Sequence, residues 1–369
     1  MKAPRIVRQD ESVRVVVRTP AELFEEGKDG KGRYAGGKWG GLYLRAPDIY
    51  FRILEKAGDK LVRLGDVAEV RFGIKTGAND FFYLEALPYR PVCPLCGEVH
   101  EEALTKEDES AYWEKGEHPP ESALVAVRNG TGWEGYLEAG SLVPVIRSPR
   151  DLPDAPLEVH ARDLNTRVFY PPDLKDHAQH YVSWGEEVEV RLSQGRNRGK
   201  RIKGYHNLPS VSTNRPWWRL SNPVPPPNLV CMMSYNDRFG FWVNWEALVD
   251  NRLYTIQPKP GVELKALAAV LNWSFVFLQQ GLLGRSNLGQ GALDFKVYEA
   301  EQLLILNPRE IKGVEKEFAE LSAFRVNEKG GKDRVAESIL GPEFEKELLR
   351  AAKEVHLERL NRAASLQGS

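Results

Sequence analysis

Short apolar runs separated by glycines and prolines fill the middle of the chain, and this pattern predicts β-strands. The predicted strands are ALVAVR (123–128), LVPVIR (142–147), RVFY (167–170), NLVCMMSY (228–235), FGFWVNW (239–245) and RLYTIQ (252–257). Nearer the N-terminus, VRVVVRT (13–19) has the same character. The region from 123 to 260 is therefore predicted to consist mainly of strands joined by turns.

The pattern becomes helical after Pro260. One helix is expected there, closed by Gly281 and Gly284, because apolar residues recur at helical spacing. Its buried face would carry Leu264, Leu267, Leu271, Ser274, Phe275 and Leu278. A helix is also expected after Pro47, with Ile49, Ile53 and Leu54 inward, and another from Pro342 to about residue 360, with Phe344, Leu348, Ala351 and Val355 inward. The run QLLILNP (302–308) predicts a further strand.

These elements predict a mixed α+β fold in three parts. Residues 1–60 would hold a strand, a glycine-rich linker and a helix, and residues 61–310 a strand-rich domain. Within that domain, the polar and acidic residues 88–122 have the character of an insertion. Residues 311–369 would form a C-terminal helical segment.

The composition bears on the cellular location of the protein and on the kinds of partner it could bind. The chain has 369 residues, 51 basic and 52 acidic side chains, and three cysteines. So few cysteines predict a reducing, cytoplasmic location without a disulfide framework. No run of apolar residues is long enough to predict a membrane span, and no secretory signal is evident. Because the charges nearly cancel, only their local distribution can indicate a polyanionic partner.

The segment VRFGIKTGANDFFYL, from Val70 to Leu84, first suggests a phosphate-binding loop. A P-loop requires Gly-Lys-Ser/Thr after four intervening residues, and a dinucleotide fingerprint requires three glycines before a helix. Neither spacing is present. We therefore predict a tight hairpin with Lys75, Thr76 and Asn79 at its tip, while Phe81, Phe82 and Leu84 enter the core.

The segment from Arg191 to Leu220 has eight basic residues and no acidic one. Its charge, glycines and interleaved aromatic residues favour nucleic-acid contact over a solvated basic loop. The predicted phosphate contacts are Arg191, Arg196, Arg198, Lys200, Arg201 and Lys203. The predicted base contacts are Asn197, Asn214, Arg215 and Arg219, with Asn287 from a later glycine-rich segment. Arg285 of that segment is predicted to contact DNA as well. Trp217 and Trp218 could stack on a displaced base or be buried structural tryptophans.

The segment CPLCGEVH, residues 93–100, resembles half of a zinc-binding motif. Two thiolates separated by a tight turn can bind one metal, so Cys93 and Cys96 are candidate ligands. His100 and His118 could complete a structural tetrahedral site, with Cys231 as a distant option. The alternative interpretation is a pair of free thiols in a turn.

No pattern of catalytic residues emerges. The chain has neither a Gly-x-Ser-x-Gly elbow nor a His-Glu-x-x-His metal motif. The histidines at 160, 177, 180, 206 and 356 fall in no recognisable triad and are predicted to lie on the surface.

Several segments, in order, resemble the C-terminal target-recognition region of TaqI-like and type IIG adenine-N6 DNA methyltransferases. They are VRFGIKTGANDFFYL, YLEAGSLVPVIRSPRD, RPWWRL, DNRLYTI and LAAVLNWSFVFLQQ…GQGALDF. The upstream KWGGLYLRAPDIYFRILEK looks like the segment that precedes that region in such enzymes. The similarity extends from about Lys38 to Asn307. It implies a module that reads a short sequence of double-stranded DNA and holds it against a catalytic domain, where a flipped adenine receives the methyl group of S-adenosylmethionine. In that context Lys75, Thr76 and Asn79, at the tip of the predicted hairpin, are candidate DNA contacts.

The chain departs from that family in lacking the catalytic motifs. It has no Asn/Asp-Pro-Pro-aromatic sequence and no glycine-rich motif for the methyl donor. We therefore expect a specificity module without catalysis of its own, which would use S-adenosylmethionine only through a partner methyltransferase domain or subunit.

Two alternatives from other classes remain open at the level of sequence. One is a divergent DNA-modifying enzyme or nuclease with an unrecognised active site, which binding of S-adenosylmethionine by the isolated protein would favour. The other is a zinc-pinned protein-interaction module, for example in phage defence, which an absence of duplex binding would favour.

Overall fold

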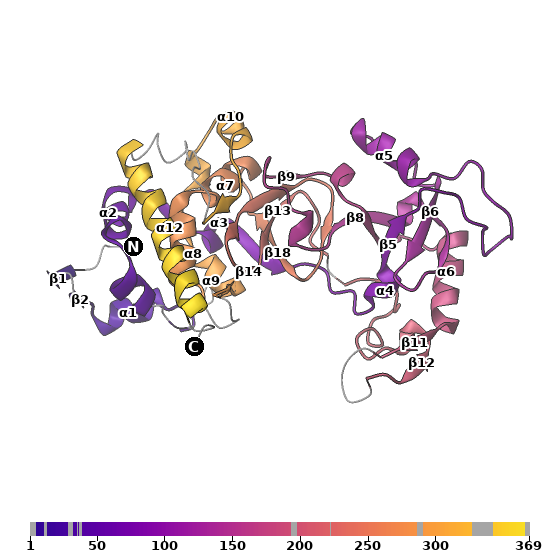
Figure 1. Cartoon of the computed structure of the whole chain (residues 1–369), viewed down its shortest axis with the longest axis horizontal. Coiled ribbons are helices and arrows are strands. Elements are labelled where there is room, and N and C mark those ends of the chain that lie inside the picture. Colours follow the sequence, from indigo (N-terminus) through magenta and orange to yellow (C-terminus); the bar gives the residue numbers. More distant parts are fainter. Residues whose placement is uncertain are drawn as a thin grey trace.

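Two lobes lie along the long axis of the molecule (Figure 1). The computed structural model describes residues 5–10, 13–28, 32–34, 36, 39–192, 198–221, 223–285, 291–326 and 342–365. One hydrophobic core, the first core, fills the lobe that contains both ends of the chain, and a second core fills the other lobe. A small satellite core around Cys93 and Tyr136 borders the second. The mixed α+β class is confirmed.

The first lobe is built on a five-stranded sheet of order β4-β18-β13-β16-β9. Its strands are β4 (Ala68–Phe72), β9 (Glu158–Val159), β13 (Asn228–Met232), β16 (Phe241–Asn244) and β18 (Leu253–Pro258). Smaller pairs join β1 (Arg5–Gln9) to β2 (Arg14–Val17), β3 (Leu61–Arg63) to β20 (Leu304–Leu306), β14 (Ser234–Tyr235) to β19 (Leu293–Asp294), and β15 (Arg238–Phe239) to β21 (Phe324–Arg325). All pairings are antiparallel except that of β9 with β16.

Helices surround this sheet (Figure 1). They are α1 (Pro20–Glu26), η1 (Gly40–Arg45), α2 (Asp48–Ala57), α3 (Leu64–Val67), α7 (Leu264–Leu271), α8 (Ser274–Leu283), α9 (Val297–Glu301), η6 (Pro308–Glu310), α10 (Glu315–Ala319) and α12 (Pro342–Ser365). The helix expected after Pro47 is α2, and Ile49, Ile53 and Leu54 are buried as predicted. The last predicted helix is α12, which extends to Ser365.

The second lobe contains a six-stranded sheet of order β17-β8-β10-β5-β6-β7. Its strands are β5 (Tyr83–Ala86), β6 (Leu124–Asn129), β7 (Glu134–Glu138), β8 (Leu142–Ile146), β10 (Thr166–Phe169) and β17 (Leu248–Val249). The other elements are α4 (Asn79–Phe82), α5 (Lys106–Glu114), η2 (Ala139–Ser141), α6 (Asp176–Glu187), η5 (Tyr205–Asn207) and the hairpin of β11 (Glu189–Arg191) with β12 (Arg201–Lys203). The 3-10 turns η3 (Pro149–Asp151) and η4 (Ala161–Asp163) lie in the connection between the lobes.

The predicted domain limits at residues 60, 310 and 311 stay predictions. In the structure the first core draws side chains from both sides of each limit, for example Leu54 with Leu64, and Leu306 with Val314. The residues between β5 and β6 include the predicted 88–122 insertion and carry α5.

The predicted hairpin around Gly73–Gly77 is wrong. The strand before it, β4, belongs to the sheet of the first lobe, whereas the strand after it, β5, belongs to the sheet of the second lobe. The segment therefore connects the two lobes. Phe81, Phe82 and Leu84 are fully buried in the second core, as predicted.

The single helix predicted after Pro260 is instead two helices, α7 and α8, bent by 60°. The break lies at Asn272, whose side-chain amide donates to the carbonyls of Phe241 and Ala268 while its oxygen accepts the Phe241 N–H. This polar anchoring to β16 competes with continuation of the helix. Gly281 does not end α8; a Cβ there would lie 2.8 Å from Val355 Cγ1, so the glycine allows α12 to approach closely.

No single helix in the described residues is long and apolar enough to cross a membrane. The bent pair α7–α8 reaches the required length and composition only when its two helices are taken together, and its residues are buried in the first core.

The junction between the lobes is held by a buried carboxylate, that of Asp250. It accepts hydrogen bonds from the Tyr83 hydroxyl and from the backbone N–H and Nε of Arg252, both at 2.9 Å. Burial, followed by the bond to Asp250, raises the pKa of Tyr83 far above its usual value. Beside this group, a Cβ on Gly73 would lie 2.2 Å from the carbonyl oxygen of Val249, so the connecting segment requires glycine at this point.

His356 corrects another prediction, because it is fully buried in α12 rather than on the surface. Its Nε2 lies 2.8 Å from the carbonyl oxygen of Phe277, and its ring packs against Phe239. Burial lowers the pKa of His356 to about 3, since the charged imidazolium would lose its hydration.

His356 is expected to make the protein less stable in mild acid. Below a pH of about 6.5 the unfolded chain binds a proton that the folded chain rejects until about pH 3, so stability falls by about 1.4 kcal/mol per pH unit in that interval. Urea unfolding at pH 7 and pH 5 should show a loss that is about 2 kcal/mol larger for the natural protein than for His356→Gln. The control His180→Gln, at a half-buried position, should behave as the natural protein does. Equal losses in all three proteins would contradict the assignment.

Removal of the Tyr83 hydroxyl should weaken the junction. Tyr83→Phe is expected to lower the free energy of unfolding by about 2 kcal/mol, because a buried hydrogen bond to a charged group is lost. The matched control is Tyr89→Phe, whose hydroxyl donates to Glu134 at an exposed site, where water can replace the lost bond, so its effect should be much smaller. Denaturant unfolding measures both. Similar losses in the free energy of unfolding for the two variants would contradict a special stabilising role of the bond between Tyr83 and Asp250.

Candidate nucleic-acid interface and metal centre

The predicted basic segment begins as a hairpin that projects from the second lobe (Figure 1). Glu189, Val190 and Arg191 on β11 pair with Lys203, Ile202 and Arg201 on β12. Two of the predicted phosphate contacts are neutralised locally: Arg201 lies 3.0 Å from Glu189, and Lys203 lies 2.5 Å from Glu187. Both glutamates precede Arg191, so they lie just outside the segment 191–220, which has basic residues but no acidic one.

Three predicted cations of the hairpin are exposed and unpaired. Arg191, Arg198 and Lys200 form no ion pair within the described part of the chain. Arg196 and Asn197, predicted as phosphate and base contacts, lie outside the described residues. The hairpin thus presents concentrated positive charge to solvent, which is the electrostatic requirement for a phosphate-backbone partner.

The two tryptophans of the segment have different environments. The Trp217 indole is buried in the second core, donates its N–H to Glu186 at 2.8 Å, and packs 4.8 Å from the ring of Phe81. It thus occupies the place of a structural tryptophan. Trp218 is half-buried, and the guanidinium of Arg219 lies 5.4 Å from the centre of its ring.

The candidate base-reading residues around Trp218 lie at the surface. Arg215 and Arg219 are exposed, and Asn214 is half-buried. The guanidinium of Arg215 donates to the carbonyls of Ser212 and Asn214, and that of Arg219 to the carbonyl of Pro172 at 3.3 Å. These bonds use only part of each guanidinium, which carries five N–H donors.

The connecting segment brings a second set of predicted residues to the same lobe. Lys75 and Asn79 are exposed, but Thr76 is buried and donates its hydroxyl to Asn79. Ser210 donates to the carbonyl of Gly77 at 2.6 Å. The segment therefore abuts the chain that leads to Asn214 and Arg219, so the structure gathers these two sets and the hairpin on the second lobe.

Arg285 is placed elsewhere. It follows α8 in the first lobe, donates from Nε to Glu299 at 2.8 Å, and pairs through its backbone with Asp294. Its charge is therefore compensated, and α8, which it follows, lies in the other lobe from the β11–β12 hairpin (Figure 1). Asn287, its predicted companion, lies outside the described residues.

Two arginines near Asn79 were missed in the sequence. Arg128 and Arg147 line a pocket of about 340 Å³ that also contains Asn79 and Asp80. Arg128 pairs with Glu85 at 3.0 Å, and the Arg147 guanidinium lies 5.0 Å from the centre of the Tyr83 ring. The one available signal was the Asn129-Gly130 pair, which marks the turn after β6 and so places Arg128 at the strand end.

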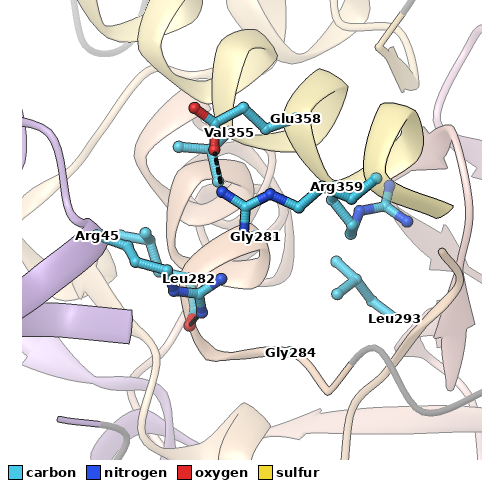
Figure 2. Close-up of a pocket in the computed structure, with 9 residues that line it drawn as sticks. Arg45, Gly281, Leu282, Gly284, Leu293, Val355, Glu358 and Arg359 are labelled. Atoms are coloured by element: carbon cyan, nitrogen blue, oxygen red, sulfur yellow. Dashed lines mark hydrogen bonds and ion pairs between the residues drawn. The ribbon is translucent and has the colours of Figure 1, made fainter. Parts of the chain in front are cut away.

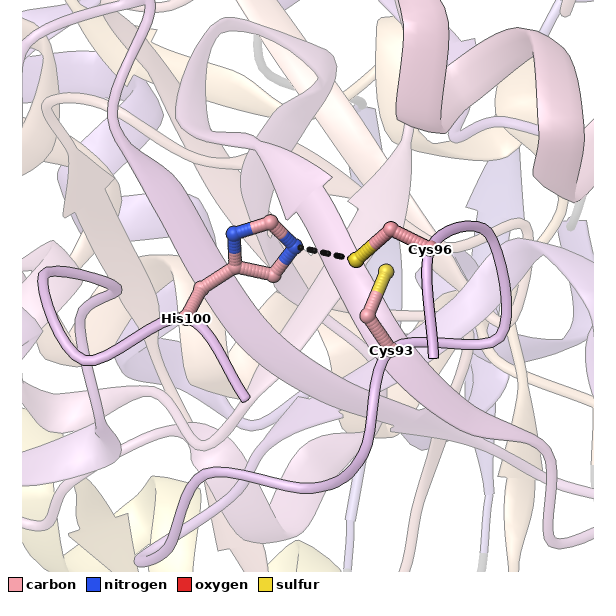
Figure 3. A group of neighbouring side chains, drawn as sticks. All are labelled: Cys93, Cys96 and His100. Carbon is pink, nitrogen blue, oxygen red and sulfur yellow. Dashed lines mark hydrogen bonds between the residues drawn. The ribbon is translucent and has the colours of Figure 1, made fainter. Parts of the chain in front are cut away.

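Cys93, Cys96 and His100 form a compact group (Figure 3). Their ligand atoms all lie within 4.8 Å of one another, and Cys96 Sγ is 3.4 Å from His100 Nε2. The turn is closed by the Gly97 N–H, which donates to the Cys93 carbonyl at 2.8 Å, and Gly97 has a positive φ of 80°. Two thiols and an imidazole at such spacing could hold a metal ion.

The environment of the group affects its thiols. Burial raises the pKa of the Cys93 thiol, although hydrogen bonds from the backbone of Cys96 and Leu95 act in the opposite direction. A bound cation would reverse this effect, because metal ligation favours the thiolate. The predicted ligand His118 is not in the group; its ring packs edge-on against Trp113 at 4.8 Å. Cys231 is buried in β13 of the first core, where burial raises its pKa to about 12.

A cavity of about 70 Å³ between α8 and α12 is lined by Arg45, Arg359 and Arg362 (Figure 2). Arg45 donates to the carbonyl of Leu282 at 3.1 Å, and Arg362 pairs with Glu358 at 3.2 Å. Arg359 donates to the carbonyls of Gly291 and Asn236, and burial lowers its pKa to about 10. Because each of the three guanidinium groups already has a hydrogen-bond or ion-pair partner within the chain, we interpret the cavity as a packing gap between helices and not as a ligand site.

Comparison with known proteins supports the fold. No protein-family model and no curated protein matches the sequence. Among solved structures, the chain is similar to the type IIG restriction endonuclease BpuSI, with a TM-score of 0.53 and 13% sequence identity. The match covers 84% of this chain but 33% of BpuSI, so the chain spans about a third of that protein's length. The architecture is therefore one that occurs within part of a type IIG restriction endonuclease.

Proposed function

We propose that this chain reads a short sequence of double-stranded DNA as the specificity module of a restriction–modification or phage-defence system. The observation that carries the proposal is the β11–β12 hairpin, which exposes three cations that have no ion-pair partner among the described residues. It belongs to the lobe that also gathers the candidate base-reading residues. The similarity in fold to part of a type IIG restriction endonuclease supports it.

Phosphate contacts would come chiefly from Arg191, Arg198 and Lys200. Because these cations have no acidic partner among the described residues, approach of DNA would cost them no existing ion pair. Arg201 and Lys203 face Glu189 and Glu187, so their net attraction for phosphate is smaller. Such contacts set affinity and orientation, and they do not depend on base sequence.

Base recognition would come from Arg215, Arg219 and Asn214, with Lys75 and Asn79 from the connecting segment. Arginine can bind guanine and asparagine can bind adenine through two hydrogen bonds in the major groove. Each such pair is worth about 1–3 kcal/mol of discrimination between bases. The half-buried ring of Trp218 beneath Arg219 would hold that guanidinium in a fixed orientation.

Methyl transfer would require a partner. The Asn/Asp-Pro-Pro-aromatic motif is missing from the sequence, so S-adenosylmethionine and the flipped adenine would be bound by a methyltransferase domain or subunit. We also propose that the metal held by Cys93, Cys96 and His100 is a structural zinc ion, because thiolate and imidazole ligands favour zinc.

The hairpin can be tested by a triple variant, Arg191→Ala/Arg198→Ala/Lys200→Ala. Duplex binding should weaken for every sequence alike, and the slope of log affinity against log salt should become shallower by about 3, one for each phosphate contact. The measurement is fluorescence anisotropy of a labelled duplex, titrated with protein at several salt concentrations between about 50 and about 200 mM.

A matched control removes the same charge elsewhere. Arg309→Ala/Lys312→Ala/Lys316→Ala changes three exposed cations of the first lobe and should leave the salt slope unchanged. If both triple variants change the slope equally, net charge rather than the hairpin governs binding. If neither does, the hairpin is not the DNA-binding surface.

A further inference from the structure

We propose that His177, at the start of α6, is the fourth ligand of a tetrahedral zinc site with Cys93, Cys96 and His100. This inference deepens the proposed structural zinc and rests on it, but it is independent of DNA binding. It replaces His118, which the sequence suggested, by a histidine far along the chain.

The spacing of the rings fits two imidazoles on one metal. The ring centres of His100 and His177 are 5.3 Å apart, with the rings inclined by 76°. Two imidazoles bound through nitrogen at the usual zinc distance and tetrahedral angle have ring centres roughly 5 Å apart. The 3.4 Å between Cys96 Sγ and His100 Nε2 is likewise close to the roughly 3.5 Å expected for sulfur and nitrogen on one tetrahedral zinc ion.

The nitrogen required for binding is buried and unpaired. Nε2 of His177 has no hydrogen-bond partner among the described residues. A buried polar atom without a partner costs free energy, and an unseen ion is one of its recognised explanations. His177 lies outside the compact group of three, so its ring must turn toward them when the metal binds.

A carboxylate lies beside the other nitrogen of the His177 ring. Glu138 on β7 accepts the backbone N–H groups of His177 and Ala178 at 3.0 and 3.1 Å, and its Oε1 lies 3.6 Å from His177 Nδ1. The proton is thereby favoured on Nδ1, which leaves the lone pair of Nε2 for a metal.

His100 has the same arrangement. Its Nδ1 lies 3.5 Å from Glu102 Oε1, while Nε2 faces Cys96. Both imidazoles thus have a carboxylate near Nδ1. Nε2 of His100 faces Cys96, and Nε2 of His177 has no partner among the described residues. Carboxylate–histidine–zinc arrangements of this kind are common around metal ions.

Four protein ligands would connect two separate parts of the second lobe. Zinc would tie the loop that contains Cys93 to α6, and α6 also carries Glu186, which accepts the Trp217 N–H. A site filled by two thiolates and two imidazoles leaves no position for a reactive water, so its role would be structural.

Metal binding by the full chain tests the proposal. The purified protein should contain one zinc per chain, and cobalt substitution should give the intense visible absorption of a tetrahedral site with thiolate charge transfer. His177→Gln should weaken zinc binding by more than about 100-fold, since loss of an outer-shell partner alone costs about 10–100-fold. His118→Gln is the matched control and should bind as the natural protein does.

A second variant guards against misfolding of the first. His177→Cys keeps a ligand at the position, so it should retain tetrahedral cobalt absorption with a charge-transfer band about half as intense again, as expected for three thiolates in place of two. Natural protein without zinc, or unchanged affinity and spectrum in His177→Gln, would overturn the proposal. Duplex binding measured on the same samples shows separately whether the proposed DNA function holds.

Discussion

The arrangement of the molecule depends on the buried carboxylate of Asp250, which lies where the chain passes between two hydrophobic cores. An ionised carboxyl group away from water is costly unless its oxygens are satisfied. Here the Tyr83 hydroxyl comes from the second lobe and the two Arg252 donors from the return to the first lobe. The Asp250 carboxylate therefore fixes the position of β5 relative to β18. Because Gly73 has no side chain, the connecting segment can pass close to the carbonyl of Val249.

From that junction, Phe81 organises the surface that we assign to DNA. Its ring is within 4.5 Å of Tyr181 on α6 and 4.8 Å of Trp217, measured between ring centres, and it also contacts Tyr205. The connecting segment, the helix before the basic hairpin and the segment with the candidate base-reading residues thus share one aromatic centre. Exposed polar side chains are held in place by buried rings, which is how a rigid scaffold can position flexible contacts.

The sequence predicted elements better than it predicted their partners. Periodicity found α2, α12 and six strands of the two sheets, since each buries a face that repeats locally. These strands are β6, β8, β10, β13, β16 and β18, whereas β7, β9 and β17 were not predicted. It could not show that β4 and β5 join different sheets, that Asn272 binds β16 and bends the helix, or that His356 is buried beside Phe239, because these facts depend on distant residues. The charge of the hairpin was overstated for a similar reason, since Glu187 and Glu189 stand just outside the basic segment.

The parallel edge strands β9 and β17 have a consequence for experiments that exchange DNA specificity between proteins. A contiguous graft from Ile74 to Leu220 would carry the second lobe but would take β9 with it, and β9 belongs to the sheet of the first lobe. The same graft would leave behind β17, which completes the sheet of the second lobe beside β8. A recombinant that kept both sheets intact would need four additional crossover points, two around β9 and two around β17, so the interwoven path of the chain restricts which chimeras can inherit a new recognition surface.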